Sequence, residues 1–272
     1  MNDKVIGQGT HGIIKVKNAR QVVKLFENRN NLSSSDYEFI IQEKIYNVVY
    51  NGNGNGHCNG HCNSDYKILI PKPGKFGLVN GWCYYEMDYI YPPFGNNVLV
   101  QIDMGEPRVD DVHPGVGRFL GYENLSLARC NLMSLEELAY EIGKIFSLLH
   151  YVMRLDGFDC ELVIGQLWSD TLEECKENVF LIDFDKVSVF EFSLGCTVNR
   201  KIDQNMVETR VLSSVGKFAW FLFNGLTGMS LLPRDDKLKK MFLAGYASNV
   251  GNLKSQLEKD IYNEIVGLIM IY

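Results

Sequence analysis

Three glycines near the start of the chain, Gly7, Gly9 and Gly12, form a G-x-G-x-x-G pattern between two strand-like segments, residues 4–8 and 12–17. Glycines at such a turn let backbone amides approach phosphate groups without interference from Cβ atoms. In a dinucleotide-binding unit a helix would follow the glycines, whereas here a second strand follows. The pattern therefore predicts an antiparallel hairpin, either as a phosphate-binding loop or as a plain tight turn.

A lysine and a glutamate follow this loop in order. Residues 21–26 predict a third strand that holds Lys24 among apolar neighbours, where an inward lysine needs a carboxylate partner. Residues 36–50 predict a helix, because apolar residues recur there at helical spacing after a run of N-cap residues. Glu43 on this helix is the expected partner of Lys24, and Glu38 is the second choice. The plain alternative is a solvated strand lysine.

A glycine loop, a strand lysine and a helix glutamate in this order resemble the protein kinase fold. The resemblance implies that Lys24 contacts the phosphates of ATP and that an ion pair with Glu43 positions it. It also implies that adenine hydrogen-bonds to the backbone of Glu86, Met87 and Asp88, because the segment containing them is similar to the kinase hinge.

The resemblance extends to a magnesium site. Asp183-Phe184-Asp185 is similar to the kinase D-F-G motif, which implies Asp183 as a ligand of Mg²⁺ and puts Asp185 where kinases have glycine. Glu161 replaces the metal-binding asparagine of the kinase catalytic loop. We therefore expect Asp183, helped by Glu161 or Asp185, to hold Mg²⁺.

The catalytic loop departs most from the kinase pattern. Where kinases have H-R-D-x-x-x-x-N, this chain has Arg-Leu-Asp-Gly-Phe-Asp-Cys-Glu at residues 154–161. By spacing, Asp156 takes the position of the catalytic base. Because Arg154 stands two places before Asp156 instead of one, Asp159 is a second candidate. His150 is expected to cap carbonyl groups, and Cys160 has no histidine base in its sequence context.

A second resemblance concerns residues 159–165. Their sequence, Asp-Cys-Glu-Leu-Val-Ile-Gly, is similar to the D-V-E-F-V-L-G motif of a kinase-like domain family of unknown function, best known from fungi. The Gly-Arg-Phe-Leu-Gly run at 117–121 and the segment 181–185 fit the same family. The resemblance covers about residues 5–225 and implies a fold more than an activity.

The predicted fold is α+β, a two-lobed protein-kinase-like fold with its boundary at about 88–95. Residues 1–90 form a small antiparallel β-sheet lobe with one helix, and residues 91–272 form a larger, mainly helical lobe. Ser134 and Glu137 make a capping box at the start of an amphipathic helix that ends near residue 150. Further expectations are strands at 66–70, 82–87 and 178–184, a turn at 72–75, and helices at 207–224, 234–247 and 252–271.

Residues 51–65 form a low-complexity loop rich in Asn-Gly pairs. The side chains of His57, Cys58, His61 and Cys62 offer possible zinc ligands within this loop. Zinc modules gather ligands from two separated pairs, whereas here Asn-Gly-His-Cys simply repeats. We therefore interpret the cluster as an incidental tandem repeat.

Composition limits the classes of partner. The chain has 27 Lys and Arg against 33 Asp and Glu, a net charge of −6, which disfavours nucleic acid as a partner. No apolar run approaches the roughly 20 residues that a membrane-spanning helix needs, so no membrane partner is expected. The start of the chain lacks the pattern of a secretory signal. The seven cysteines are expected to be thiols, and the protein is expected inside the cell, in the cytoplasm or nucleus.

These observations favour a pseudokinase that binds ATP or a protein partner in or around the interlobe cleft, with little or no phosphotransfer. The altered catalytic loop is the reason for this preference. The alternative is an active ATP- and Mg²⁺-dependent phosphotransferase. Its acceptor would be a small molecule or an atypical protein, because nothing after Asp185 resembles the A-P-E motif that ends a kinase activation segment.

Overall fold

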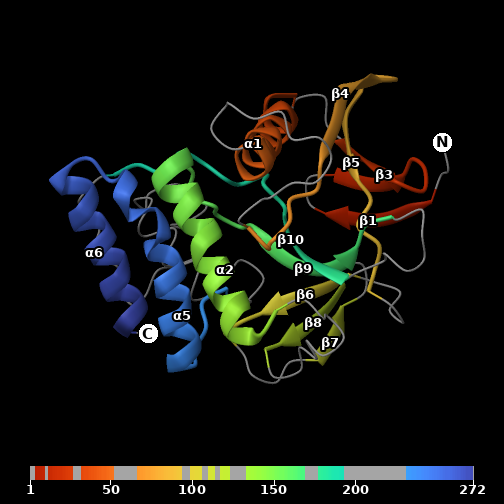
Figure 1. Cartoon of the computed structure of the whole chain (residues 1–272). Helices are drawn as coiled ribbons and strands as arrows, with labels where there is room; N and C mark the ends of the chain where they lie inside the picture. Colours follow the sequence, from red (N-terminus) through yellow and green to blue (C-terminus); the bar gives the residue numbers. More distant parts are fainter. Residues whose placement is uncertain are drawn as a thin grey trace.

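A computed structural model of the chain contains two five-stranded sheets, one built before residue 89 and the other after residue 99 (Figure 1). The residues that it describes are 4–9, 12–26, 32–51, 66–93, 99–105, 110–113, 117–122, 133–168, 177–192 and 231–271. The predicted helix 207–224 and residues 52–65, with His57, Cys58, His61 and Cys62, lie outside these ranges. The division at residue 90 stays a prediction.

The first sheet is antiparallel, with strand order β1-β2-β3-β5-β4. Its strands are β1 (Val5–Gly9), β2 (Gly12–Val16), β3 (Gln21–Phe26), β4 (Pro73–Val79) and β5 (Trp82–Asp88). The predicted hairpin is confirmed, with Gly9 paired to Gly12 across it. Gly12 is also required by packing, because a Cβ atom there would lie 2.5 Å from the carbonyl oxygen of Leu25.

Two local predictions in this half are wrong. The turn expected at 72–75 is part of β4, and the chain instead turns at Asn80 and Gly81, whose φ angles are 49° and 80°. Positive φ at both central residues is what a two-residue hairpin needs, and Asn-Gly supplies it. The segment 66–70 is not a strand of the first sheet. It makes a single parallel bridge, from Leu69 to Phe180 in the second sheet.

The second sheet was not predicted as a unit. Its strands are β6 (Val100–Asp103), β7 (Asp110–His113), β8 (Gly117–Gly121), β9 (Glu161–Gln166) and β10 (Glu177–Ile182), in the order β10-β9-β6-β8-β7. Only the β6–β8 pair is parallel. The antiparallel β9–β10 hairpin carries the candidate acidic residues at its ends.

Helices complete this half, and three of them lie side by side in Figure 1. The three are α2 (Leu135–Ser147), α5 (Asp236–Tyr246) and α6 (Gln256–Ile271), and the shorter π-helical η2 (Leu148–Met153) and 3₁₀ segment η4 (Ala247–Asn252) follow α2 and α5. The predicted cap is confirmed, since the Ser134 hydroxyl accepts from the Glu137 amide at 3.1 Å. Helices α2 and α5 cross closely because Gly143 and Gly245 have no side chains; a Cβ on Gly143 would lie 2.0 Å from the Phe242 carbonyl oxygen.

Helix α1 (Leu32–Asn51) joins two hydrophobic cores. Phe39 packs against the small core of the first sheet, where its ring lies 5.9 Å from that of Tyr85. Ile41, Ile45 and Val49 belong to the large core that also contains the second sheet and the helices. The helix therefore fixes the first sheet relative to the rest of the molecule.

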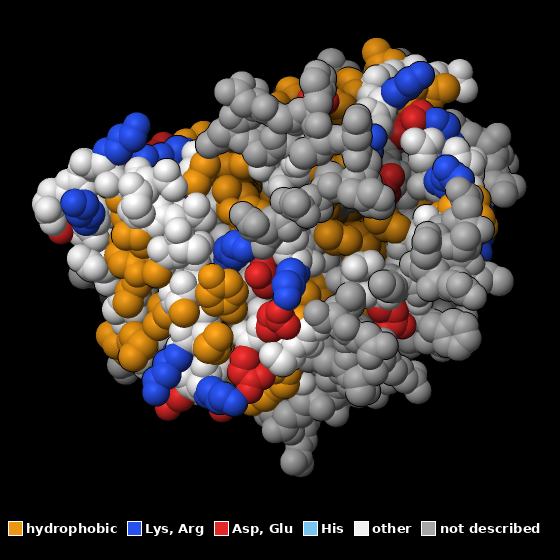
Figure 2. Space-filling model, viewed as in Figure 1, with side chains coloured by type: hydrophobic (Ala, Val, Ile, Leu, Met, Phe, Trp, Pro, Cys, Tyr) orange, Lys and Arg blue, Asp and Glu red, His pale blue; other side chains and the backbone are white. Residues whose placement is uncertain are grey.

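The surface of the described residues carries charges of both signs. On the face in Figure 2, Lys and Arg side chains lie beside Asp and Glu side chains, and hydrophobic side chains gather over the part where α5 and α6 lie in Figure 1. Among the described helices, none combines the length and hydropathy that crossing a bilayer would require.

Candidate functional site

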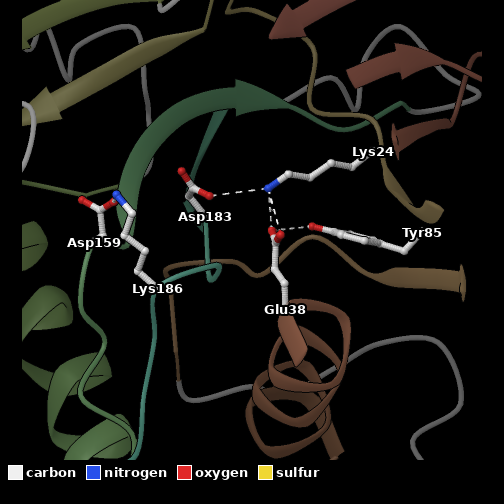
Figure 3. A network of polar contacts seen from close by, with 6 residues as sticks. All are labelled: Lys24, Glu38, Tyr85, Asp159, Asp183 and Lys186. Atoms are coloured by element: carbon white, nitrogen blue, oxygen red, sulfur yellow. Dashed lines mark hydrogen bonds and ion pairs between the residues drawn. The ribbon is translucent and has the colours of Figure 1, made fainter. Parts of the chain in front are cut away.

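A buried ion pair between β3 and α1 forms the centre of the candidate site (Figure 3). The Nζ atom of Lys24 lies 2.7 and 2.9 Å from the two carboxylate oxygens of Glu38. Tyr85 stands directly opposite Lys24 in the β3–β5 register, and its hydroxyl donates to the same carboxylate at 2.7 Å. Glu38 thus accepts from two strands at once, which holds α1 against the sheet.

The prediction that Glu43 pairs with Lys24 is wrong, and Glu38 is the partner. Five residues of α-helix turn the side chain by about 140°, so Glu38 and Glu43 cannot both face the sheet. The side chain of Glu43 is exposed. The signal was present in the sequence, because Glu38 shares the helical spacing of the buried residues Ile41 and Ile45.

Lys24 keeps its positive charge in this site. Burial opposes the charge, but the carboxylates of Glu38 and Asp183 outweigh that effect, and the pKa of Lys24 is raised. The Oδ1 atom of Asp183 lies 3.6 Å from its Nζ atom. Burial and the neighbouring Glu38 also raise the pKa of Tyr85, so its hydroxyl stays a donor at neutral pH. The result is a fixed ammonium group between two carboxylates.

Asp183 follows the last residue of β10 and has a left-handed backbone with a φ of 62°. Such a conformation is uncommon for a residue with a Cβ atom, but aspartate tolerates it better than most residues do. Its side chain is 35% exposed, whereas that of Lys24 is 11% exposed. Burial raises the pKa of Asp183, and the charge of Lys24 opposes this shift.

The other predicted metal ligands, Glu161 and Asp185, lie near Asp183. Glu161 opposes Ile182 in the β9–β10 register, one residue from Asp183. Its pKa is raised to about 7, first by burial and then by the charges of Asp159 and Asp185, with Gln101 and Lys24 opposing. A divalent cation would relieve this repulsion between carboxylates, so the donor set fits Mg²⁺.

These carboxylates do not form a complete metal site by themselves. Within the described ranges, no three His, Cys, Asp or Glu side chains are arranged to hold a metal ion. Mg²⁺ commonly binds through one or two carboxylates together with substrate phosphates and water. The metal role of Asp183, Glu161 and Asp185 therefore stays a prediction, one that a bound phosphate would have to complete.

Asp156 does not fit the predicted role of catalytic base. Its side chain is buried, with 0% of the residue exposed. Its Oδ1 atom accepts from the amides of Phe158 at 3.1 Å and Ser188 at 2.8 Å, and its Oδ2 atom accepts from the Ser188 hydroxyl. A general base must come within hydrogen-bond reach of the proton that it removes. Enclosed in this way, the Asp156 carboxylate is out of reach of an acceptor substrate.

Asp159, the second candidate base, is paired with Lys186, which follows Asp183 by three residues. Figure 3 shows Asp183 between Lys24 on one side and Lys186, with its partner Asp159, on the other. The Nζ atom of Lys186 is 2.9 Å from the Asp159 carboxylate. Asp159 also has a left-handed backbone, with a φ of 64°. Its role as a base stays a prediction.

His150 contacts a carbonyl group of the following loop, and Cys160 is a buried thiol. The Nε2 atom of His150 lies 3.2 Å from the Asp156 carbonyl oxygen, and its Nδ1 atom lies 2.6 Å from the Tyr246 hydroxyl. Complete burial lowers the pKa of His150 to about 3, so the ring is neutral at physiological pH. Burial raises the pKa of the Cys160 thiol, which disfavours a thiolate.

The predicted adenine contacts fall within β5, between β3 and β4. Met87 is paired with Val22 on one side and with Pro73 on the other. The amide of Asp88 donates to the carbonyl of Lys72 at 3.0 Å, so this amide does not fit the predicted role. Contacts through the backbone of Glu86 and Met87 stay predictions, as does phosphate binding by the glycine hairpin.

Comparison with known proteins adds a weak structural likeness. No protein-family model and no curated protein matches the chain. Among 97 solved chains that match, one is a crystal structure of a kinase domain, with 13% sequence identity and a TM-score of 0.40 over 99% of this chain and 85% of the other. A likeness at this level carries no argument about the site, and the resemblance to the mainly fungal family is not confirmed.

An antiparallel five-stranded sheet with one helix carries Lys24 and Glu38, and a second part rich in helices carries Asp183 at the end of the β9–β10 hairpin. These elements give the chain an α+β fold, and its likeness to the kinase fold stays a prediction.

Proposed function

We propose that the chain is a pseudokinase that binds ATP with Mg²⁺ at Lys24 and Asp183 and transfers little or no phosphate. The observation that supports nucleotide binding is the Lys24–Glu38–Tyr85 group. It fixes a charged ammonium group 3.6 Å from Asp183, which is partly exposed. An ammonium group held in this way is a ready partner for phosphate oxygens.

Each residue of the site has a role in this proposal. Lys24 would exchange part of its contact with Asp183 for the nucleotide phosphates, while Glu38 and Tyr85 keep it in position. Asp183, with Glu161 or Asp185, would hold Mg²⁺, which when bound neutralises phosphate charge. The repulsion that raises the pKa of Glu161 to about 7 would then be relieved.

Weak phosphotransfer is proposed because the acidic loop residues are engaged elsewhere. Asp156 is enclosed by Phe158 and Ser188, and Asp159 is paired with Lys186. A base that is enclosed or neutralised by a lysine is poorly placed to accept a hydroxyl proton.

The alternative, an active phosphotransferase, has one specific observation in its favour. Glu161 has a pKa of about 7, which suits general acid–base chemistry at neutral pH, and Asp159 lies close enough to raise it. In that case Asp159, released from Lys186, would orient the acceptor hydroxyl.

A thermal-shift titration with ATP, with and without Mg²⁺, tests the proposal. A ligand at 100 times its dissociation constant stabilises the native state by about 2.7 kcal/mol. We expect a magnesium-dependent shift that is lost in Lys24→Ala and Asp183→Asn and retained in Glu43→Gln, the matched change on the exposed face of α1. No shift at millimolar ATP would overturn the proposal.

A phosphate-release assay on the same samples distinguishes the two candidates. The pseudokinase proposal predicts a thermal shift without release above background. Release that is abolished by both Lys24→Ala and Asp183→Asn would establish the enzyme instead, whereas release that neither change affects would indicate a contaminant.

A further inference from the structure

The loop before β9 and the segment after Asp185 are joined by a short antiparallel pairing. Leu155 and Val189 form a β-bridge, and the amide of Asp156 donates to the carbonyl of Ser188 at 2.9 Å. The loop supplies the candidate base Asp159, and the segment directly follows the candidate metal ligands. The pairing therefore joins the two acidic parts of the candidate site.

The Asp156 carboxylate is the centre of this connection. Both of its oxygen atoms accept hydrogen bonds from Ser188, one from the amide at 2.8 Å and the other from the hydroxyl. Oδ1 also accepts from the amide of Phe158, within its own loop. One side chain thus fixes the turn of its own loop and the backbone of the other segment.

His150 contacts both strands of this pairing. Its Nε2 atom donates to the Asp156 carbonyl, and its neutral ring stacks on Phe190 at 4.4 Å with an interplanar angle of 17°. The amide of Phe190 donates to the carbonyl of Arg154 at 2.8 Å. The hydroxyl of Tyr246 in α5 completes the hydrogen bonding of the histidine. The pairing is therefore anchored to the helical core.

The connection restrains Asp183, because Ser188 follows it by only five residues. Within that interval Lys186 holds Asp159 at 2.9 Å. Asp183 has a left-handed backbone and stands between two elements that fix the course of the chain. On one side is β10, and on the other is the segment that Asp156 holds.

We propose that Asp156 is a positioning residue, whose carboxylate holds Ser188 and thereby keeps Asp183 in place beside Lys24. This replaces the role of base that its place in the sequence implies. The inference depends on the proposed nucleotide function only for its second measurement, described below.

Hydrogen–deuterium exchange of the full chain tests the positioning role without any ligand. The variants are Asp156→Ala, Asp156→Asn and Ser188→Ala, with Val189→Ala as the matched control, because the Val189 side chain is 60% exposed beside Ser188. Asn keeps an amide oxygen that accepts from the two backbone amides, whereas Ala keeps no acceptor.

The expected result is faster exchange in residues 183–190, by about tenfold in Asp156→Ala and less in Asp156→Asn and Ser188→Ala, with β3 and α1 unchanged and Val189→Ala like the wild type. Unchanged exchange in 183–190, or an equal increase throughout the protein, would overturn the inference. If Asp156→Ala does not fold, faster exchange confined to residues 183–190 in Ser188→Ala and Asp156→Asn would support the inference, and unchanged exchange there would overturn it.

ATP binding with Mg²⁺ provides a readout that a purely structural role would not move. Misplacing Asp183 should weaken ATP binding more in the presence of Mg²⁺ than without it. Relative to the wild type, the loss of affinity should be largest in Asp156→Ala and smaller in Asp156→Asn. Equal ATP affinity with Mg²⁺ in wild type, Asp156→Asn and Asp156→Ala would overturn the inference. If the wild type does not bind ATP, the proposed function fails, while the exchange result still judges the role of Asp156.

Discussion

Lys24 and Asp156 are both buried ionisable residues of the candidate site, but their surroundings differ. Lys24 is surrounded by charged partners, Glu38 and Asp183, and the latter is partly exposed. The carboxylate of Asp156 binds backbone amides and a hydroxyl inside the fold. The first arrangement keeps a charge available to a ligand, whereas the second uses a carboxylate to hold the backbone. This difference is the basis for proposing nucleotide binding without efficient proton transfer.

Lys24→Met is expected to cause the largest loss in the free energy of unfolding. It leaves the buried Glu38 carboxylate without its cation, which typically lowers the free energy of unfolding by about 3–5 kcal/mol. Chemical denaturation measures the loss, and Lys44→Met, at an exposed position of α1, is the matched control. A loss within about 0.5 kcal/mol, as for an ordinary surface change, would contradict the ion pair.

Tyr85→Phe should cause the second-largest loss in the free energy of unfolding. Glu38 loses one of its donors, and a hydrogen bond to a charged group contributes about 1.5–3 kcal/mol. Tyr84→Phe, next to it in β5, removes a hydroxyl from a half-buried ring and is expected to change the free energy of unfolding by under about 0.5 kcal/mol. Equal losses in both variants would show that Tyr85 does not hold Glu38.

Lowering the pH should reduce the free energy of unfolding through His150, which contacts the Asp156 carbonyl. Its pKa is about 3 in the folded chain and about 6.5 when unfolded, so the unfolded state binds the proton first as pH falls. The contribution of neutral His150 to the free energy of unfolding is complete above pH 6.5. Below that pH it is lost at about 1.4 kcal/mol per pH unit, down to about pH 3.

The free energy of unfolding of wild type and His150→Gln, measured from pH 7.5 down to 5, tests this slope. The wild type should lose stability more steeply, whatever the absolute stability of the variant. Parallel curves would contradict a neutral, buried His150.

The pair of Lys186 and Asp159 should have the smallest effect. Lys186 is 37% exposed, and exposed ion pairs contribute about 0.2–1 kcal/mol. Lys186→Met should therefore lower the free energy of unfolding by under about 1 kcal/mol, and by less in 1 M salt, where screening is strong. A loss above about 2 kcal/mol would mean that this pair is a structural element comparable to Lys24 and Glu38.

The local parts of the fold could be predicted from the sequence. The glycine hairpin, the strand of Lys24 and the capped helix α2 follow from turn residues, alternation and capping, which act within a few residues. The second sheet could not be predicted in the same way. Its β6 and β7 have four residues each, and β6 pairs with β9 some 60 positions away, a contact that no local pattern specifies.

The candidate site was predictable to the same extent. Lys24 and Asp183 come together as expected, because each stands at a recognisable place in a strand pattern. The interval along the chain predicts Glu43 as the partner of Lys24, whereas the buried face of the helix selects Glu38. The burial of Asp156 depends on Ser188, which is far from it in sequence.

Isothermal titration of ATP with Mg²⁺ into wild type and Lys24→Ala, side by side, tests the central claim most directly. The account predicts saturable binding to the wild type at one site and an affinity at least about tenfold weaker in the variant, a difference of about 1.4 kcal/mol. Equal affinity in the two proteins, or no binding to the wild type at millimolar ATP, would contradict it.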